Sequence, residues 1–419
     1  MGMARSVPCR IRTRGDAGEG AGILRCPHRH RITLSPAMPS TPLPPFTPVV
    51  AALPPSVPFV GPETLERRRG APFTARIGAN ESASGPSPRA REAMQAVLQD
   101  GGARFYGDPE SHELRAALAE RHGVAMEEIV VDAGIDTLLG VTARLFLAPG
   151  QTAVTSLGAY PTFSFHVAGA GAAQVNVPYR DDCEDTVALA AAAREHGARL
   201  VYLSNPDNPM GTCCTREEVE ALVAALPREC LLLLDEAYID YLDADEAAAI
   251  NPPIDTGDPR VLRYRTFSKA WGMAGLRIGY AIGHREVIAG FERVRNHFGV
   301  NRLAQAAALA SLQDEEYLVR VRGEVRQGRR RIVALAQRHG LVPIPSLTNF
   351  VTVDAGSAPR AVALMQALQE AGVFVRKPAV APLDRCVRIG VGTPDELGQL
   401  ESLLGDVLQR VDASLHPQQ

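Results

Sequence analysis

Short apolar runs alternate with amphipathic segments through the middle of the chain. The runs are rich in Val, Ile and Leu, as buried strands are, and the segments between them return apolar residues every three or four positions, as helices do. The runs lie at residues 129–131, 153–155, 175–177, 200–203, 231–234 and 261–264. This alternation predicts an α/β fold with a mostly parallel sheet covered by helices on both faces. Ligands of such sheets bind at the carboxyl ends of the strands.

Local helix signals agree with this fold. Ser87-Pro88 is a typical helix opening, and Thr215 with Glu218 forms a capping box at the start of another helix. Further helices are expected at about 111–122 and 136–146.

The pattern changes after a long helical region at about 301–339. Strand-like runs then surround one helix, with the strands at 350–353, 373–376 and 387–389 and the helix at 359–371. This change predicts a second, smaller domain of the α+β class.

The first 70 residues differ from the rest. Residues 1–37 carry arginines with few apolar residues, and residues 38–62 are rich in proline, so no core element is predicted there. Met38 is an alternative start of the protein. Ordered structure is expected from about Arg76. The predicted parts are a disordered or loosely attached arm (1–70), a large domain with leading helices (71–300), a small domain (301–412) and a tail (413–419).

Composition narrows the class of function. The 419 residues are 46% hydrophobic and 22% charged, with a net charge of −3. A chain of this length forms about two or three domains, and it has no broad basic field of the kind that nucleic-acid binding requires. No apolar run reaches the ~18 residues of a membrane span. Seven cysteines are scattered without metal-site spacing, so we expect no metal and a reduced, cytoplasmic setting.

The candidate chemistry centres on Lys269. This lysine follows the apolar run at 261–264, stands beside the hydroxyl residues Thr266 and Ser268, and is followed by Arg277 among small residues. An amine, hydroxyl donors and a fixed cation in one segment suit an aldehyde cofactor that carries a phosphate. The alternative for an isolated Ser-Lys pair is a solvated surface lysine.

Two further strand ends carry polar residues. Asp235 directly follows the run at 231–234, where a carboxylate can pair with a protonated ring nitrogen, or else cap a helix. Asn208 lies in a Pro-rich turn after the run at 200–203, where it either only reverses the chain or donates to the phenolic oxygen of a cofactor ring. Tyr238 could donate to the same oxygen.

The first strand and the second are followed by an anion site and an aromatic residue. Gly134, Ile135 and Asp136 join residues 129–131 to a helix, so backbone N–H groups at the helix start can hold a phosphate. Tyr160 can lie flat on a cofactor ring, or else be an ordinary tyrosine at the edge of the core.

Together these motifs resemble those of the class I/II pyridoxal-phosphate aminotransferases, and are most similar to the histidinol-phosphate aminotransferase branch. The match covers about residues 58–410. It implies the type I fold, with a large, mostly parallel seven-stranded sheet domain and a smaller α+β C-terminal domain. The implied cofactor is pyridoxal 5′-phosphate, bound covalently by Lys269, with Asp235 at the pyridine nitrogen and Asn208 and Tyr238 at the phenolic oxygen. Tyr160 would stack on the ring. The implied phosphate ligands are the backbone at Ile135 and Asp136 together with Ser268 and Arg277, and Gly134 and Thr266 complete the implied cofactor site.

The resemblance also implies an assembly and a substrate site. Tyr106 matches a tyrosine that reaches the phosphate in the neighbouring subunit, which implies a homodimer with shared active sites. Arg388 matches the arginine that binds the substrate carboxylate, Arg376 matches the position that reads the distal anion, and Asn349 joins them as a substrate residue. The chain departs from the branch pattern at Phe59, where a tyrosine is usual, and at Gly107, Ile135 and Thr137.

The implied reaction moves an amino group between an amino acid or amino alcohol phosphate, similar to histidinol phosphate, and a 2-oxo acid such as 2-oxoglutarate. In it, Lys269 moves a proton at the substrate α-carbon. The alternative enzyme is a decarboxylase or lyase of the same fold, similar to threonine-phosphate decarboxylase. A transcription regulator with a domain of this type would need an N-terminal DNA-binding helical domain, which the aperiodic first 60 residues do not offer.

Overall fold

The computed structural model describes residues 44–54 and 59–415. The chain divides into a first unit, of which only residues 44–46 are described, and a second unit, residues 47–419, which holds all the helices and strands of the described residues. The predicted alternative start at Met38, most of the predicted N-terminal arm and residues 416–419 of the predicted tail lie outside the described residues.

The centre of the second unit is a seven-stranded sheet with strand order β2-β8-β7-β6-β5-β3-β4. Only the two pairings that involve β8 are antiparallel. The predicted seven-stranded, mostly parallel sheet is therefore confirmed, although the residue pattern had not indicated β8. The strands are β2 (Ile129–Asp132), β3 (Thr152–Ser156), β4 (Ala173–Val177), β5 (Leu200–Ser204), β6 (Leu231–Asp235), β7 (Val261–Thr266) and β8 (Gly279–Ile282).

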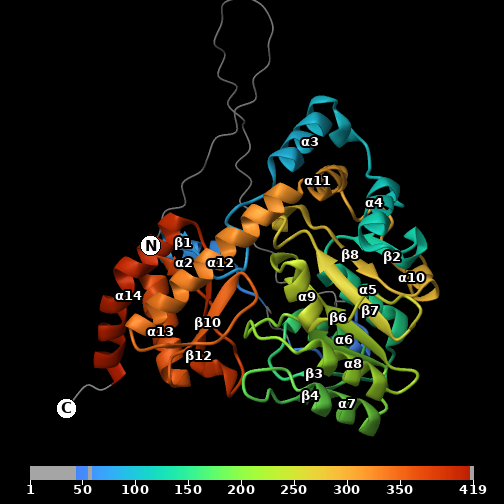
Figure 1. Ribbon diagram of the computed structural model, residues 1–419. Helices are drawn as coiled ribbons and strands as arrows, with labels where there is room; N and C mark the ends of the chain where they lie inside the picture. The colour runs from blue at the N-terminus through green and yellow to red at the C-terminus, as the bar shows by residue number, and fades with distance from the viewer. Residues whose placement is uncertain (1–43, 55–58, 416–419) are drawn as a thin grey trace, which may run out of the picture. The chain divides into compact units, whose positions relative to one another are not determined.

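Helices cover both faces of this sheet (Figure 1). In β6, Leu231 and Leu233 pack into one apolar cluster, whereas Leu232 and Leu234 pack into another on the opposite face. Successive side chains of a strand point to opposite faces, so a strand that is apolar throughout must be covered twice. The first cluster includes α5 (Ile135–Phe146), α6 (Pro161–Gly169) and α10 (Arg285–Phe291), and the second includes α7 (Thr186–Glu195) and α8 (Arg216–Ala225).

The C-terminal part is α+β, as predicted. It contains a three-stranded antiparallel sheet of order β12-β10-β9 and a short parallel pair, β1 with β11. Its elements are β1 (Ala75–Arg76), α12 (Glu315–Arg338), β9 (Val342–Pro343), β10 (Phe350–Asp354), α13 (Ala358–Glu370), β11 (Val373–Phe374), β12 (Cys386–Gly390) and α14 (Pro394–Leu415).

The prediction that ordered structure begins near Arg76 is wrong. Helix α2 (Pro62–Arg69) precedes it, and α1 (Pro48–Ala51) comes earlier still. Helix α2 is held by an ion pair of 2.6 Å between Glu63 and Arg76 and by Glu66, which accepts a hydrogen bond of 2.9 Å from the backbone of Phe73. Because these contacts are polar and α2 is mostly charged, hydrophobic periodicity gave no signal for this helix.

The predicted domain boundaries at 71 and 301 remain proposals, and the packing argues for moving both. Strand β1 pairs with β11 of the smaller part, so the chain touches that part before it enters the sheet. Helix α11 (Arg302–Leu312) packs against α3 (Pro88–Gln99) and α4 (His112–His122) of the larger part. A division inside the long helix α12 fits these contacts better than one before α11.

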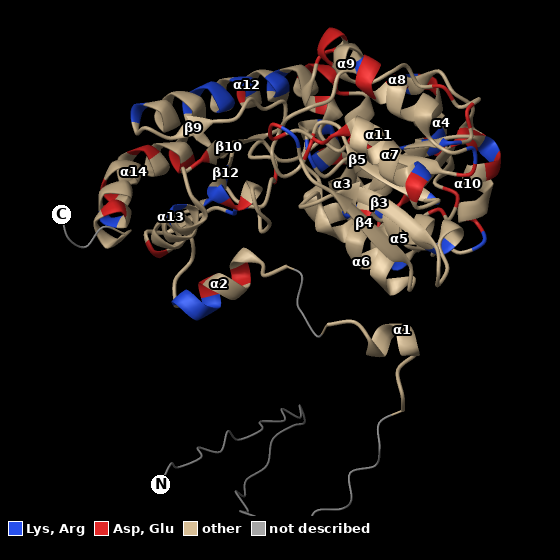
Figure 2. Ribbon diagram, turned by 90° about the horizontal axis from the view of Figure 1, so that it is seen from below, with Lys and Arg blue, Asp and Glu red and all other residues tan. Residues whose placement is uncertain are grey.

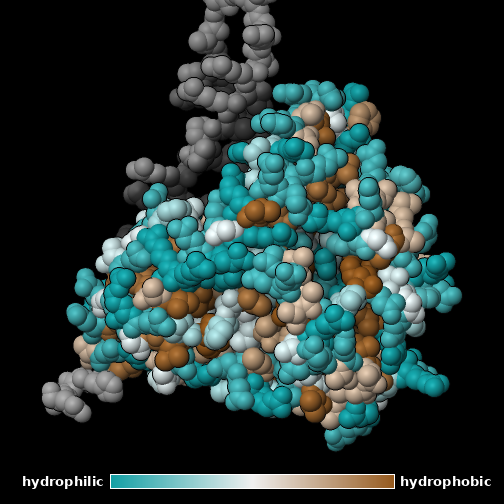
Figure 3. All heavy atoms as spheres, in the orientation of Figure 1, coloured by the Kyte–Doolittle hydropathy of each residue, from teal (hydrophilic) through white to brown (hydrophobic). Residues whose placement is uncertain are grey.

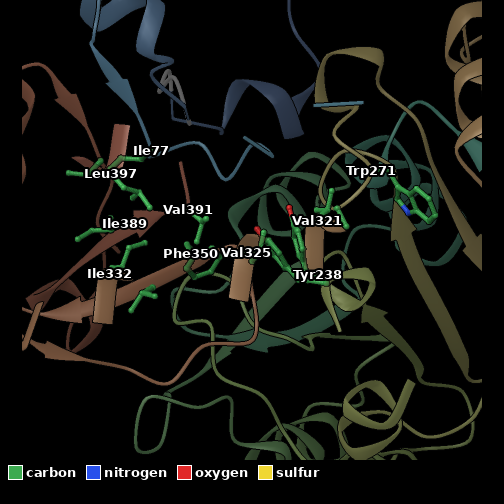
Figure 4. Close-up of a cluster of buried hydrophobic side chains, with 14 of the residues drawn as sticks. Ile77, Tyr238, Trp271, Val321, Val325, Ile332, Phe350, Ile389, Val391 and Leu397 are labelled. Atoms are coloured by element: carbon green, nitrogen blue, oxygen red, sulfur yellow. The ribbon is translucent and has the colours of Figure 1, made fainter. Parts of the chain in front are cut away.

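One apolar cluster runs along α12 from the smaller part to the sheet (Figure 4). Ile332 packs in it with Ile389 of β12, and Val321 belongs to the same cluster as Tyr238 and Trp271. The two parts therefore share a core. The carboxyl ends of the parallel strands face residues of β10 and β12 across this core.

The surface carries both charged and hydrophobic residues. Figure 2 shows Lys and Arg positions along α12, while Asp and Glu are spread over the other helices. On the face seen in Figure 3, hydrophobic residues are scattered between hydrophilic ones, which is ordinary for a protein surface. No helix in the described part of the chain is long and apolar enough to cross a membrane.

Candidate active site

A cavity lies at the carboxyl ends of the parallel strands. It collects most of the residues that the sequence singled out: Ile135, Asp136, Tyr160, Asn208, Asp235, Tyr238, Thr266, Ser268, Lys269 and Arg277 all line it. These residues end or follow the strands β2, β3, β5, β6 and β7, so the sheet brings together positions that are far apart in the sequence.

Lys269 projects into this cavity from the loop after β7. Its Nζ donates a hydrogen bond of 3.1 Å to the backbone carbonyl of Asn80. Burial, followed by the positive charge of Arg388, lowers the pKa of Lys269 to about 8. A lysine with such a pKa carries an appreciable neutral fraction near neutral pH, which a nucleophilic amine requires.

Asp235 ends β6 and is fixed by two donors. The hydroxyl of Tyr202 donates to Oδ2 at 2.7 Å, and the backbone N–H of Ala237 donates to Oδ1 at 2.9 Å. Burial raises the pKa of Asp235 to about 6, and the hydrogen bond from Tyr202 is the largest influence in the opposite direction. Asp235 thus remains largely ionised at neutral pH.

Tyr238 and Asn349 meet at the loop before α3. Asn80 donates from Nδ2 to the hydroxyl of Tyr238 at 2.9 Å, and burial raises the pKa of Tyr238 to about 12, so the phenol keeps its proton. Asn349 donates to the carbonyls of Asn80 and Glu81 at 3.2 and 3.0 Å. Asn349 therefore holds the loop that carries Asn80. Its predicted role in substrate binding stays a prediction.

An anion cradle forms where α5 begins. Gly134 has φ +88°, a backbone conformation that residues with a side chain rarely adopt, and a Cβ atom there would lie 2.8 Å from Nη2 of Arg277. Ile135 and Asp136, in the first turn of α5, line the same cavity, and the N–H groups of a first helical turn have no partner within the helix. Thr266 accepts a hydrogen bond of 3.0 Å from the backbone of Ser268 and fixes the loop that presents the Ser268 hydroxyl.

Asp136 connects the anion cradle at the start of α5 to Tyr160. The hydroxyl of Tyr160 donates to its Oδ1 at 3.1 Å, and Nη2 of Arg277 donates to its Oδ2 at 3.3 Å. Burial raises the pKa of Tyr160, with Asp136 as the next cause. Phe59 lies against Tyr160, with ring centroids 6.2 Å apart.

The two predicted substrate arginines lie side by side. Arg376 and Arg388 form an antiparallel bridge, so their side chains come from neighbouring backbone segments. Both line a second cavity that adjoins the first, since Asp136, Tyr160, Asn208 and Lys269 line both. Arg388 donates to the side chain of Asn208, and Arg376 donates to the carbonyl of Val60 at 2.8 Å.

Tyr106 is the one predicted cofactor residue that stands apart on the surface. Its side chain is 78% exposed and its ring lies 5.0 Å from that of Phe298. It lines neither cavity of this chain. This placement is compatible with service in a neighbouring subunit, which stays a prediction.

The comparisons with known proteins decide the family. A model of the aminotransferase class I and II family matches residues 76–402. The chain belongs to this family. It is 37% identical over 368 residues to a histidinol-phosphate aminotransferase of Roseiflexus castenholzii, covering 86% of this chain and 97% of the relative. It is 36% identical over 365 residues to histidinol-phosphate aminotransferase 2 of Pseudomonas aeruginosa, covering 86% and 97%.

Solved structures of this family agree. The histidinol-phosphate aminotransferase of Sinorhizobium meliloti, in complex with pyridoxal-5′-phosphate, is 45% identical with a TM-score of 0.83, and the match covers 87% of this chain and 98% of that one. Aspartate aminotransferase of Thermus thermophilus is 24% identical with a TM-score of 0.74, which shows the shared fold alone. The resemblance to the class I/II aminotransferases is thus confirmed.

Two residues of this aminotransferase's site were missed from the sequence. Asn80 has φ +57°, a conformation that asparagine tolerates better than most residues, but one sequence does not show φ. Tyr202 carried a signal that could have been used. It is the only polar side chain inside the apolar run 200–203, and a fully buried tyrosine hydroxyl needs a partner.

A buried ion-pair network supports the strand end of this aminotransferase. Glu236 follows Asp235 and pairs with Nη1 of Arg263 at 2.8 Å and with Nε of Arg265 at 2.9 Å. Burial alone would raise the pKa of Glu236, but the charges of Arg265 and Arg263 outweigh it and hold that pKa below its ordinary value. The pairs lock β6 to β7 beside the cavity.

Proposed function

We propose that this aminotransferase uses pyridoxal 5′-phosphate and transfers an amino group between histidinol phosphate, or a closely related amino acid or amino alcohol phosphate, and a 2-oxo acid such as 2-oxoglutarate. The observation that carries the proposal is one cavity in which an amine, a buried carboxylate and a helix N-terminus converge: Lys269, Asp235 and the start of α5. The names of the similar proteins support the choice of donor.

The residues present fit this cofactor. Lys269 would bind its aldehyde, Asp235 its ring nitrogen, and Tyr238 with Asn208 its phenolic oxygen. The cradle at Gly134, whose Cβ-free backbone lets Arg277 approach, suits its phosphate. When bound, the cofactor supplies an electron sink for the charge that develops at the substrate α-carbon.

The chain's own contribution is to place charges and move a proton. The ionised Asp235 would keep the ring nitrogen of the cofactor protonated through a charge-assisted hydrogen bond. With the cofactor bound, the amine of Lys269 would be placed to hold and move the proton at the substrate α-carbon. Its pKa of about 8 suits both halves of that task at neutral pH.

The second cavity, which we assign to the substrate and call the substrate cavity, suits an anionic group. Arg376, Lys377 and Arg388 line it, and none of the three forms a salt bridge within the described residues. Nε of Arg388 is buried and has no hydrogen-bond partner there. Burial lowers the pKa of Arg376 and of Arg388, because desolvation disfavours their charge. A phosphate or carboxylate of the substrate would relieve that cost.

Three further parts of the proposal rest on the sequence. The chain forms a homodimer in which Tyr106 serves the neighbouring site, it binds small molecules as donor and acceptor, and it works in the cytoplasm. The same-fold decarboxylase would use nearly the same cofactor residues, and no feature of the cavity favours it.

The reaction itself is the test. Purified protein with pyridoxal phosphate should form glutamate from histidinol phosphate and 2-oxoglutarate, and formation should stop when the 2-oxo acid is omitted. Release of carbon dioxide from threonine phosphate without any acceptor, and no glutamate from a panel of amino donors, would replace the proposal by the decarboxylase.

A further inference from the structure

Asp235 is supported from the neighbouring strand by Tyr202, which lines the same cavity. Tyr202 lies on β5, which runs parallel to β6 with Ser204 in register with Asp235. Tyr202 itself is in register with Leu233, two residues before Asp235, and its hydroxyl donates to Oδ2 of Asp235 at 2.7 Å. The other oxygen is held by a backbone N–H of the loop after β6. Two rigid donors thus set the plane of the carboxylate.

The ring of Tyr202 has no room to turn away. Tyr202 is 0% exposed, and its ring stacks on that of Phe163, with centroids 5.1 Å apart and an interplanar angle of 13°. Burial, followed by the charge of Asp235, raises the pKa of Tyr202 well above its ordinary value, so its hydroxyl stays a proton donor. The donor is therefore in place before any ligand binds.

Resting on the proposed function, we infer that Tyr202 is a positioning residue for the cofactor: its hydroxyl holds Asp235 ionised and oriented toward the ring nitrogen. Without that hydroxyl, the buried carboxylate of Asp235 loses a charge-assisted hydrogen bond and becomes freer to rotate. Both changes weaken the grip on a protonated ring. The expected consequence, exerted through Asp235, is weaker binding of the cofactor and a slower proton transfer.

Tyr202→Phe is the test, and the chain offers a matched control. Tyr264 lies on β7 in register with Asp235 on the other side of β6. It is likewise fully buried, and its hydroxyl is bonded to Thr142 Oγ1 at 2.7 Å instead of to Asp235. Tyr264→Phe removes the same atom at the same depth without touching the carboxylate. The two variants therefore separate the loss of a buried hydroxyl from the loss of this particular hydrogen bond.

The dissociation constant of pyridoxal phosphate, followed by its visible absorption, is the first readout. We expect Tyr202→Phe to raise it about tenfold, the loss of roughly one strong hydrogen bond to a charged group, and Tyr264→Phe to leave it within about twofold. The pH dependence of the bound cofactor's absorption should shift in Tyr202→Phe alone. Equal dissociation constants and equal spectra in the two variants, at equal thermal stability, would overturn the inference.

A double-mutant cycle with Asp235→Asn isolates the pair. In the Asp235→Asn background, Tyr202→Phe should change cofactor affinity by less than about twofold, because the hydroxyl no longer acts on a carboxylate. An undiminished effect there would show that Tyr202 acts in some other way. If Asp235→Asn by itself left affinity unchanged, the proposed cofactor site would fail instead. Should Tyr202→Phe not fold, 3-fluorotyrosine at position 202 keeps the hydroxyl but makes it a stronger donor to Asp235, so the cofactor spectrum should shift, and an unaltered spectrum would count against the role.

Discussion

Glu236→Gln tests whether the ion pairs beside Asp235 hold the strand end. The substitution keeps the size of the side chain but leaves the guanidinium groups of Arg263 and Arg265 without their carboxylate. Glu236 is 1% exposed. Breaking a buried pair by removing one partner costs about 3–5 kcal/mol, so we expect the free energy of unfolding to fall by about that amount. Cofactor affinity should fall as well, since Asp235 and Ala237 flank this residue.

Urea unfolding at a fixed cofactor concentration measures the effect. Glu401→Gln is the matched control, because its pair with Arg331 spans a similar 2.7 Å but is 31–34% exposed and should contribute at most about 1 kcal/mol. The pKa of Glu236 is lowered in the folded chain, so its stabilisation is complete above its unfolded pKa of about 4.3 and is lost as the pH falls through the folded value. This reasoning would be refuted if Glu236→Gln lost no more free energy of unfolding than Glu401→Gln. It would also be refuted if the loss in Glu236→Gln stayed the same at low pH.

Three other predictions concern the reaction. Asp235→Ala should lower the turnover rate by several orders of magnitude, since the ring nitrogen would lose its proton; single-turnover rates within a few-fold of the unaltered enzyme would exclude the assigned role. Arg376→Lys should raise the Michaelis constant for a phosphorylated donor far more than for an uncharged one, because lysine lacks the guanidinium fork; if the donor is an ordinary amino acid, substitutions of Arg388 should dominate instead. Mixed dimers of inactive Tyr106→Ala and Lys269→Ala subunits should regain one competent site, and their failure to do so after verified subunit exchange would argue against shared active sites.

Local signals were enough to predict most of the sheet. Runs such as 231–234 are apolar at every position because both faces of β6 are covered, and a strand of this kind is recognisable without any partner. Strand β8 was not predicted because it consists only of Gly279–Ile282 and comes directly after the motif around Arg277. Helix α2 was not predicted because its charged residues make polar contacts, so the helix has no apolar stripe.

The site was predictable where a residue stands at a strand end. Asp235 and Lys269 could be placed from their positions after apolar runs, and the cavity does bring them together. The contacts that tune them come from residues remote in sequence, such as Tyr202 on a neighbouring strand and Asn80 on a loop before the sheet. Pairings between strands depend on sheet order, which the alternation of strands and helices does not specify.

The central claim is that Lys269 carries the cofactor, and the composition makes it unusually easy to test. The sequence contains only two lysines, Lys269 and Lys377, and both line the substrate cavity. Borohydride reduction of the cofactor-loaded protein, followed by proteolysis and mass spectrometry, identifies the amine that is bonded to pyridoxal phosphate. We predict a single reduced adduct on Lys269, absent from Lys269→Ala. An adduct on Lys377 or on the chain's α-amino group, or no adduct in protein that retains the yellow cofactor, would contradict this claim.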